Sequence, residues 1–281
     1  MQGAGARCDF CYYEGMPRAH RHIQAGYTYH VTHRCHDRAF LLRFARDRQD
    51  YRAWLIEGLA RSDVRLLTYC ITSNHVHLLL KSRSVEELSA FMQRVAGGMA
   101  QAYNQRKART GAFWSDRYHA VMIEDGVHLG RCMRYIDLNM VRAGVVAHPS
   151  EWEWTGWREL MGERRRNRLL CMDSVLNALD MKSVDDFRKQ HAVAVAEAIR
   201  GRVTGREPWW TESVAVGSAG FAANIEQVLK ADYTRRRLQT DETSAGTWVL
   251  RESAPDAYGG KSRPENRPIR PFSPIESQLT I

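Results

Sequence analysis

Hydrophobic and polar residues follow one another in the first third of the chain at spacings that predict strands and one helix. Residues 26–35 alternate with a period of two, which predicts a strand. Residues 46–61 carry apolar side chains at helical spacing, which predicts a helix. Two further apolar runs, 64–71 and 75–81, are separated by a short polar connection. They predict a pair of strands joined as a hairpin.

The pattern continues with a helix, a strand and another helix. Ser84 and Glu87 have the spacing of a capping box, and the helix that they open has one apolar stripe. Residues 118–124 predict a fourth strand, and residues 127–143 predict a helix that ends at Gly144. The order strand, helix, strand, strand, helix, strand, helix is that of a ferredoxin-like unit. We therefore expect an α+β fold with an antiparallel sheet, helices on one face, and a C-terminal helical extension.

Changes in pattern divide the chain into four segments. Two helical stretches, 173–200 and 211–238, follow the ferredoxin-like unit, and Ser, Pro, Gly and Arg dominate after about residue 240. The expected segments are an N-terminal extension (1–15), the main domain (16–168), a helical extension (169–238) and a disordered tail (239–281).

Composition favours a polyanionic partner. The chain has 281 residues, a net charge of +9 and a pI of about 9.4, and a basic excess of this kind is common in nucleic-acid-binding proteins. Its 6 cysteines are too sparse for a disulfide scaffold, so we expect a reduced, cytoplasmic setting. Cys8 and Cys11 could supply half of a zinc site, but no second pair follows at suitable spacing. No apolar stretch is long enough to predict a membrane span.

The pair His75 and His77 is the first candidate for chemistry. Side chains at positions i and i+2 of a strand point to the same face, so both imidazoles project together, about 7 Å apart along the backbone. Two convergent imidazoles can bind one metal ion. The alternative is two ordinary histidines on a solvated strand face, and spacing alone leaves that alternative open.

Tyr135 and Asn139 lie four residues apart in the predicted helix 127–143, and therefore share a helix face. If this face meets the two histidines, a phenol nucleophile would lie beside a metal held by two imidazoles and one amide oxygen. Packing roles for both residues remain the alternative, since the chain has 11 tyrosines and spacing does not distinguish this one.

Four segments, taken in order, resemble single-tyrosine HUH transposases, and more specifically REP-associated tyrosine transposases of the insertion-sequence-200-like group. Residues 69–80 resemble the HUH-motif strand, and residues 26–34 resemble the first strand of that family. Residues 113–118 resemble its motif before the last core strand, and residues 135–144 its nucleophile helix. The resemblance covers about residues 16–160.

The resemblance implies a single-stranded DNA endonuclease and strand transferase that depends on Mg²⁺ or Mn²⁺ and acts at DNA hairpins in the bacterial cytoplasm, associated with the nucleoid. Tyr135 would be the nucleophile that forms a 5'-phosphotyrosine, and His75, His77 and Asn139 would be the metal ligands. The residues predicted to contact DNA are Arg18, Arg21, Arg34, Arg117, Tyr118 and Arg142.

Some features leave alternatives open. Met140 stands where members of this family often have proline, which would let the helix continue. A catalytically silent hairpin-binding protein with the same fold is the second hypothesis. A replication initiator or relaxase is a third, although such proteins usually carry further domains that we do not find here. The resemblance does not decide between a monomer and a homodimer.

Overall fold

The computed structural model describes residues 22–202, 205–232, 238–243 and 246–252 of the chain. The predictions made for residues 1–15 and for Arg18 and Arg21 therefore lie outside the described residues, as does the CxxC pair.

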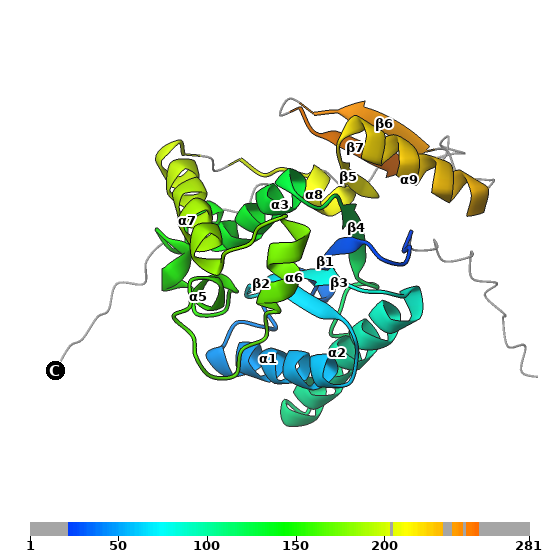
Figure 1. The fold of residues 1–281 in the computed structure, drawn as a ribbon. Coiled ribbons are helices and arrows are strands. Elements are labelled where there is room, and N and C mark those ends of the chain that lie inside the picture. The colour runs from blue at the N-terminus through cyan, green and yellow to red at the C-terminus, as the bar shows by residue number, and fades with distance from the viewer. Residues whose placement is uncertain (1–21, 203–204, 233–237, 244–245, 253–281) are drawn as a thin grey trace, which may run out of the picture.

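The first half of the described chain forms one α+β unit (Figure 1). Its elements are β1 (Thr28–Arg34), the 3-10 helix η1 (His36–Arg38), α1 (Ala45–Ala60), β2 (Arg65–Ile71), β3 (His75–Lys81), α2 (Val85–Arg106) and β4 (His119–Ile123). The four strands lie in the order β2-β3-β1-β4, and every neighbouring pair is antiparallel. This order confirms the predicted ferredoxin-like arrangement.

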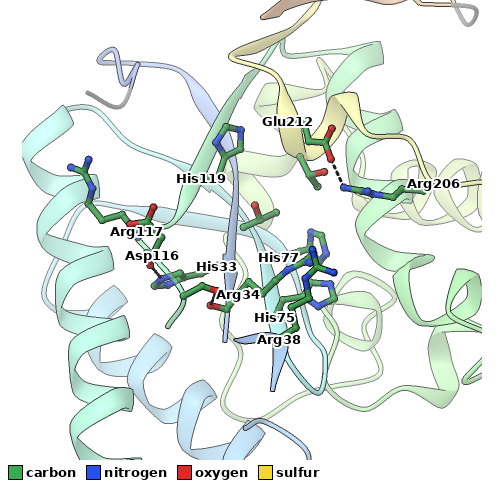
Figure 2. Close-up of a pocket in the computed structure, with 13 residues that line it drawn as sticks. His33, Arg34, Arg38, His75, His77, Asp116, Arg117, His119, Arg206 and Glu212 are labelled. Carbon is green, nitrogen blue, oxygen red and sulfur yellow. Dashed lines mark hydrogen bonds and ion pairs between the residues drawn. The ribbon is translucent and has the colours of Figure 1, made fainter. Parts of the chain in front are cut away.

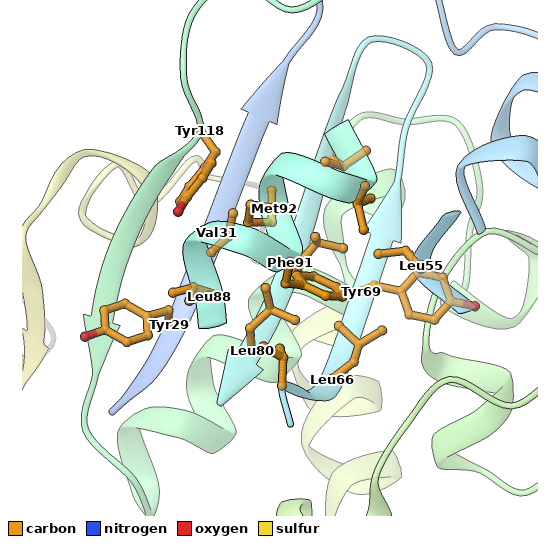
Figure 3. Close-up of a cluster of buried hydrophobic side chains, with 14 of the residues drawn as sticks. Tyr29, Val31, Leu55, Leu66, Tyr69, Leu80, Leu88, Phe91, Met92 and Tyr118 are labelled. Atoms are coloured by element: carbon orange, nitrogen blue, oxygen red, sulfur yellow. The ribbon is translucent and has the colours of Figure 1, made fainter. Parts of the chain in front are cut away.

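Helices α1 and α2 cover one face of this sheet. Side chains of alternate strand residues, such as Tyr29, Val31 and Tyr69, pack there against Phe91 and other apolar residues of the two helices (Figure 3). The α2 helix begins where its sequence predicts, because the Ser84 hydroxyl accepts a hydrogen bond from the Glu87 backbone N–H at 3.1 Å.

Helices also cover the opposite face of the sheet, whereas the sequence predicted helices on one face only. Between Leu66 and Ile71 every side chain of β2 is buried, so both sides of this strand need an apolar cover. Leu67 and Cys70 belong to a second cluster, to which α3 (Val127–Asp137) contributes. The remaining elements up to residue 212 are α4 (Asn139–Arg142), η2 (Pro149–Glu151), α5 (Trp157–Leu160), α6 (Met172–Ala178), α7 (Val184–Arg200) and α8 (Trp209–Glu212).

The C-terminal extension contains strands as well as helices, which corrects the prediction of one helix over 211–238. The elements there are β5 (Ala215–Gly217), α9 (Ala219–Asp232), β6 (Leu238–Glu242) and β7 (Trp248–Glu252). Strand β5 pairs in parallel with β4, so the described residues form one mixed seven-stranded sheet ending in β5-β7-β6. The short apolar run of β5 occupies the outer edge of β4, which would otherwise be unpaired.

Strands β6 and β7 also correct the prediction of a disordered tail from residue 239. Val249 and Leu250 of β7 are fully buried, which explains why this segment is ordered despite its polar surroundings. Residues 253–281 lie outside the described part of the chain. Among the helices that the structure describes, none has the length and apolar character needed to cross a bilayer.

Candidate functional site: a histidine pair, a tyrosine and a basic pocket

Strand β3 presents His75 and His77 on the same face, as the alternation of the sequence predicts. The centroids of the two rings lie 4.9 Å apart. His77 is buried, with 3% of its surface exposed, whereas His75 lies at the rim of a pocket and is half-buried. The two imidazoles therefore converge beside space that a ligand can enter.

The α3 and α4 helices bring Tyr135 and Asn139 to the same place. The Tyr135 ring centroid lies 6.2 Å from that of His77, and Asn139 Nδ2 lies 2.9 Å from His77 Nε2. The sequence predicted one helix over 127–143, but the helix is interrupted at Leu138, whose ψ is 3°. Both side chains nevertheless reach His77, so the four candidate residues form one cluster.

Hydrogen bonds at Nδ1 determine which nitrogen each histidine presents to the cluster. His75 Nδ1 lies 2.7 Å from the carbonyl oxygen of the Asn74 side chain, which can accept a hydrogen bond but cannot donate one. His75 Nδ1 therefore carries the proton, and the Nε2 lone pair is available. Among the described residues no hydrogen bond to His75 Nε2 is present.

Burial keeps these histidines neutral. It lowers the pKa of His75 to about 3, helped by the nearby positive charges of Arg34 and Arg206. Burial also lowers the pKa of His77 well below its ordinary value, and that of His30 behind it to about 3. Neutral imidazoles have the free lone pairs that metal binding requires.

Tyr135 lies between the histidines and Arg142. The guanidinium carbon of Arg142 is 3.9 Å from the centroid of the Tyr135 ring. Burial raises the pKa of Tyr135, and the positive charges of Arg142 and Arg206 act in the opposite direction. Arg142 Nη2 is buried and has no hydrogen-bond partner among the described residues, although a buried guanidinium N–H normally has one. This atom is suited to an incoming anion.

The cluster opens into a basic pocket of about 750 Å³. Figure 2 shows Arg34, Arg38 and the two histidines at its base, with Arg117 on one side and Arg206 on the other. Four arginines and two carboxylates, Asp116 and Glu212, line it, so the charge at its wall is positive. A pocket of this kind attracts phosphate groups.

Comparison with known proteins finds a similarity over the segment that carries this cluster. Residues 24–139 match the family model described as "Transposase IS200 like". The segment is therefore similar to IS200-like transposases over this range. Among solved structures, a REP-associated tyrosine transposase bound to a REP hairpin aligns with 56% of this chain and 90% of its own, at 16% identity and a TM-score of 0.43. A search of curated proteins finds no match.

Four of the predicted DNA contacts lie in the described part of the chain, three of them within the IS200-like match and Arg142 just after it. Arg34 and Arg117 line the basic pocket, and Arg142 lies against Tyr135. Tyr118 is different: only 7% of it is exposed and its ring belongs to the hydrophobic core, which corrects the prediction that it stacks on unpaired bases. Trp114 also packs in the fold, with its ring stacked on His33 at 4.0 Å.

Other residues of the pocket were not found by sequence reasoning. Arg206, Thr211 and Glu212 come from the segment around α8, which lies after the IS200-like match. His30 lies behind His77 on β1. The Arg206 and Glu212 side chains form an ion pair with each other at the mouth of the pocket (Figure 2). Helix α8 packs on β1 and β4, next to the point where β5 pairs with β4, and no local pattern indicates this long-range packing.

The donor atoms of the cluster are suited to a divalent cation. Two imidazole Nε2 atoms and the carboxamide of Asn139 are nitrogen and oxygen donors of the types that Mn²⁺ and related ions accept. Among the described residues no group of three or more His, Cys, Asp or Glu side chains forms a metal site. A cation here would therefore need the amide oxygen and oxygen atoms from substrate or water in addition to the two histidines.

Proposed function

We propose that the protein is a metal-dependent endonuclease and strand transferase that acts on single-stranded DNA through Tyr135. The observation that carries this proposal is the convergence of Tyr135, His75, His77 and Asn139 beside one basic pocket. The match of residues 24–139 to the IS200-like transposase model supports the same reaction class.

A Mg²⁺ or Mn²⁺ ion held by His75, His77 and the amide oxygen of Asn139 would supply Lewis-acid polarisation of the scissile phosphate. The protein's own part is to hold the two imidazoles neutral, with Nε2 directed into the pocket. The Asn139 side-chain amide contacts His77 through its nitrogen, Nδ2. The oxygen of the same amide group, which is the proposed metal ligand, therefore also lies beside His77.

The arginines of the pocket would bind and orient the DNA backbone. Arg142 has an unpartnered Nη2 beside the Tyr135 ring, and Arg34 lines both the main pocket and the smaller cavity around Tyr135. Guanidinium groups bind phosphate oxygens through charge-assisted hydrogen bonds. Placed here, they would hold a phosphodiester next to the phenol and stabilise charge that develops on it.

The covalent step transfers a phosphoryl group without an external energy source. The Tyr135 oxygen attacks phosphorus, the bond from phosphorus to the 3' oxygen breaks, and the DNA leaves with a free 3' hydroxyl. The phenol proton is lost in the step, and the leaving oxygen takes up a proton. A 5'-phosphotyrosine remains, which the 3' hydroxyl of another strand can attack in reverse.

We propose single-stranded DNA that carries a hairpin as the substrate. The net charge of +9 and the arginine-lined pocket favour a polyanion. The hairpin part of the proposal rests on the resemblance to REP-associated transposases.

The test is covalent capture of DNA. The protein is incubated with end-labelled single-stranded oligonucleotides bearing the palindromes that flank its gene, with Mn²⁺ or Mg²⁺, and the products are separated on a denaturing gel. We expect a metal-dependent adduct that is absent in Tyr135→Phe and retained in Tyr103→Phe, a matched change on α2. Binding of hairpins in native gels without any nick or adduct would favour the catalytically silent DNA-binding protein instead.

A further inference from the structure

His30 is a fully buried imidazole that lies behind the histidine pair. It stands on β1, next to β3, and its ring stacks on that of His77 with centroids 5.1 Å apart and an interplanar angle of 21°. Its Nε2 lies 2.9 Å from His77 Nδ1, and its Nδ1 lies 2.7 Å from the backbone oxygen of Trp210. His30 lines neither the basic pocket nor the cavity around Tyr135, so it lies behind the candidate ligands and is not placed to be one of them.

The chemistry of these partners fixes the direction of each hydrogen bond. A backbone carbonyl only accepts, so His30 Nδ1 must carry a proton and donate it to Trp210. The neutral ring of His30 then has an acceptor at Nε2, and His77 Nδ1 must donate to it. His77 consequently has its lone pair at Nε2, where the Asn139 amide N–H donates in return at 2.9 Å.

A charged imidazole would reverse this chain, but the surroundings disfavour it. Neither ring has a carboxylate among its hydrogen-bond partners, and His30 is completely buried. The three hydrogen bonds therefore run in one direction from Asn139 through His77 and His30 to Trp210. Trp210 belongs to α8, outside the IS200-like match, so the C-terminal segment supplies the final acceptor.

We infer that His30 is a positioning residue: anchored on the Trp210 carbonyl, it holds His77 as the Nδ1–H tautomer and directs His77 Nε2 at the cation site. This inference rests on the proposed function for the identity of the ligand. His75 reaches the same state differently, because its Nδ1 donates to the adjacent Asn74 side chain. Outer hydrogen-bond partners of this kind orient a ligating histidine and increase its basicity.

Two variants separate the hydrogen bond from simple packing. His30→Leu fills the site but offers no acceptor to His77. His30→Gln can present its amide oxygen near the position of Nε2, so it restores the acceptor. His128→Gln, a change to a histidine of α3 that does not line the pocket, serves as the control. Thermal unfolding of each variant reports whether it folds.

The experiment measures the tautomer and the metal affinity of the full chain independently of activity. Nitrogen-15 NMR of the histidine rings without metal should show His77 protonated at Nδ1 in the wild type and in His30→Gln. Calorimetric titration with Mn²⁺ should show affinity lowered about 10- to 100-fold in His30→Leu, largely restored in His30→Gln, and unchanged in His128→Gln.

The outcomes distinguish this inference from the proposed function. A wild-type His77 protonated at Nε2, or Mn²⁺ affinity equal in the wild type and folded His30→Leu, would overturn the role of His30 while leaving the nuclease intact. A wild type that neither binds Mn²⁺ nor forms an adduct would overturn the proposed function, and with it the role of His30 toward a metal. If His30→Leu does not fold, the wild-type tautomer and the His30→Gln affinity still decide the question.

Discussion

A buried hydrogen bond between His191 and Asp137 joins the helix of the candidate nucleophile to the C-terminal extension, and its removal gives a sharp prediction. His191 of α7 places Nε2 2.7 Å from Asp137 Oδ2, two residues after Tyr135 on α3. The Asp137 side chain is fully buried and that of His191 is 6% exposed. The other carboxylate oxygen, Oδ1, accepts a hydrogen bond from the Thr68 hydroxyl of β2 at 3.2 Å. The pair therefore ties α3 to both α7 and the sheet.

The change His191→Leu removes the partner of Asp137 while filling a similar volume. Asp137 would keep the hydrogen bond from Thr68 but lose the one to His191 in a buried position. Leaving a buried acceptor without its partner costs about 1–3 kcal/mol. We expect a loss of that size in the free energy of unfolding. Asp137→Asn in the His191→Leu background should recover part of it, since the carboxylate charge is gone, with a coupling of about 1–3 kcal/mol.

The assay is urea unfolding of the four proteins in this cycle, followed by tryptophan fluorescence. The ring centroid of Trp157 lies 5.7 Å from that of His191, so Trp157 contributes a fluorescence signal from this region. A cost below about 1 kcal/mol for His191→Leu, or purely additive effects, would refute the claim that this pair anchors α3. The extension would then be an appendage that packs on the domain without holding the Tyr135 helix.

Further predictions concern packing, pH and charge. A Cβ at Gly98 would lie 2.5 Å from the Trp54 ring, whereas a Cβ at Gly97 would meet nothing within 4 Å. In thermal unfolding, Gly98→Ala should therefore destabilise the protein by about 1–3 kcal/mol and Gly97→Ala should stabilise it by about 1 kcal/mol. Equal effects of the two substitutions would contradict the contact with Trp54. Burial raises the pKa of Tyr135, so its phenol is protonated at neutral pH. The rate of adduct formation should therefore rise by up to about tenfold per pH unit between about pH 7 and pH 9. A flat pH profile would argue against a phenol that must lose its proton. Arg206→Gln should weaken binding of single-stranded DNA and reduce the slope of log affinity against log salt by about 1, and an unchanged slope would exclude Arg206 as a phosphate contact.

Local periodicity was sufficient to predict the ferredoxin-like unit and which candidate side chains share a face, whereas the meeting of the two faces was expected only from the family resemblance. Alternation along β3 puts His75 and His77 on one face, and four-residue spacing puts Tyr135 and Asn139 on another. These relations depend on neighbours in sequence, which a pattern can show. The roles of these residues in chemistry stay predictions.

The parts that the sequence did not indicate depend on long-range pairing. Strand β5 is three residues long, too short for a period to be read, and it forms because the edge of β4 is available. The packing of the α8 segment on β1 and β4 also joins parts of the chain far apart in sequence, and it places Arg206 at the pocket and the carbonyl of Trp210 beside His30. The prediction that Tyr118 contacts DNA failed because its burial also depends on long-range packing: only the folded sheet shows that its ring lies in the core.

Identification of the residue that becomes linked to DNA tests the central claim most directly. The adduct formed with a hairpin-bearing oligonucleotide and Mn²⁺ would be digested with a nuclease and then with trypsin, and the peptides would be sequenced by mass spectrometry. We expect the added mass of a nucleotide on Tyr135, in the peptide 135–142 that trypsin releases by cutting after Arg134 and after Arg142. A nucleotide on any other residue, or strand cleavage without a covalent link to the protein, would contradict it.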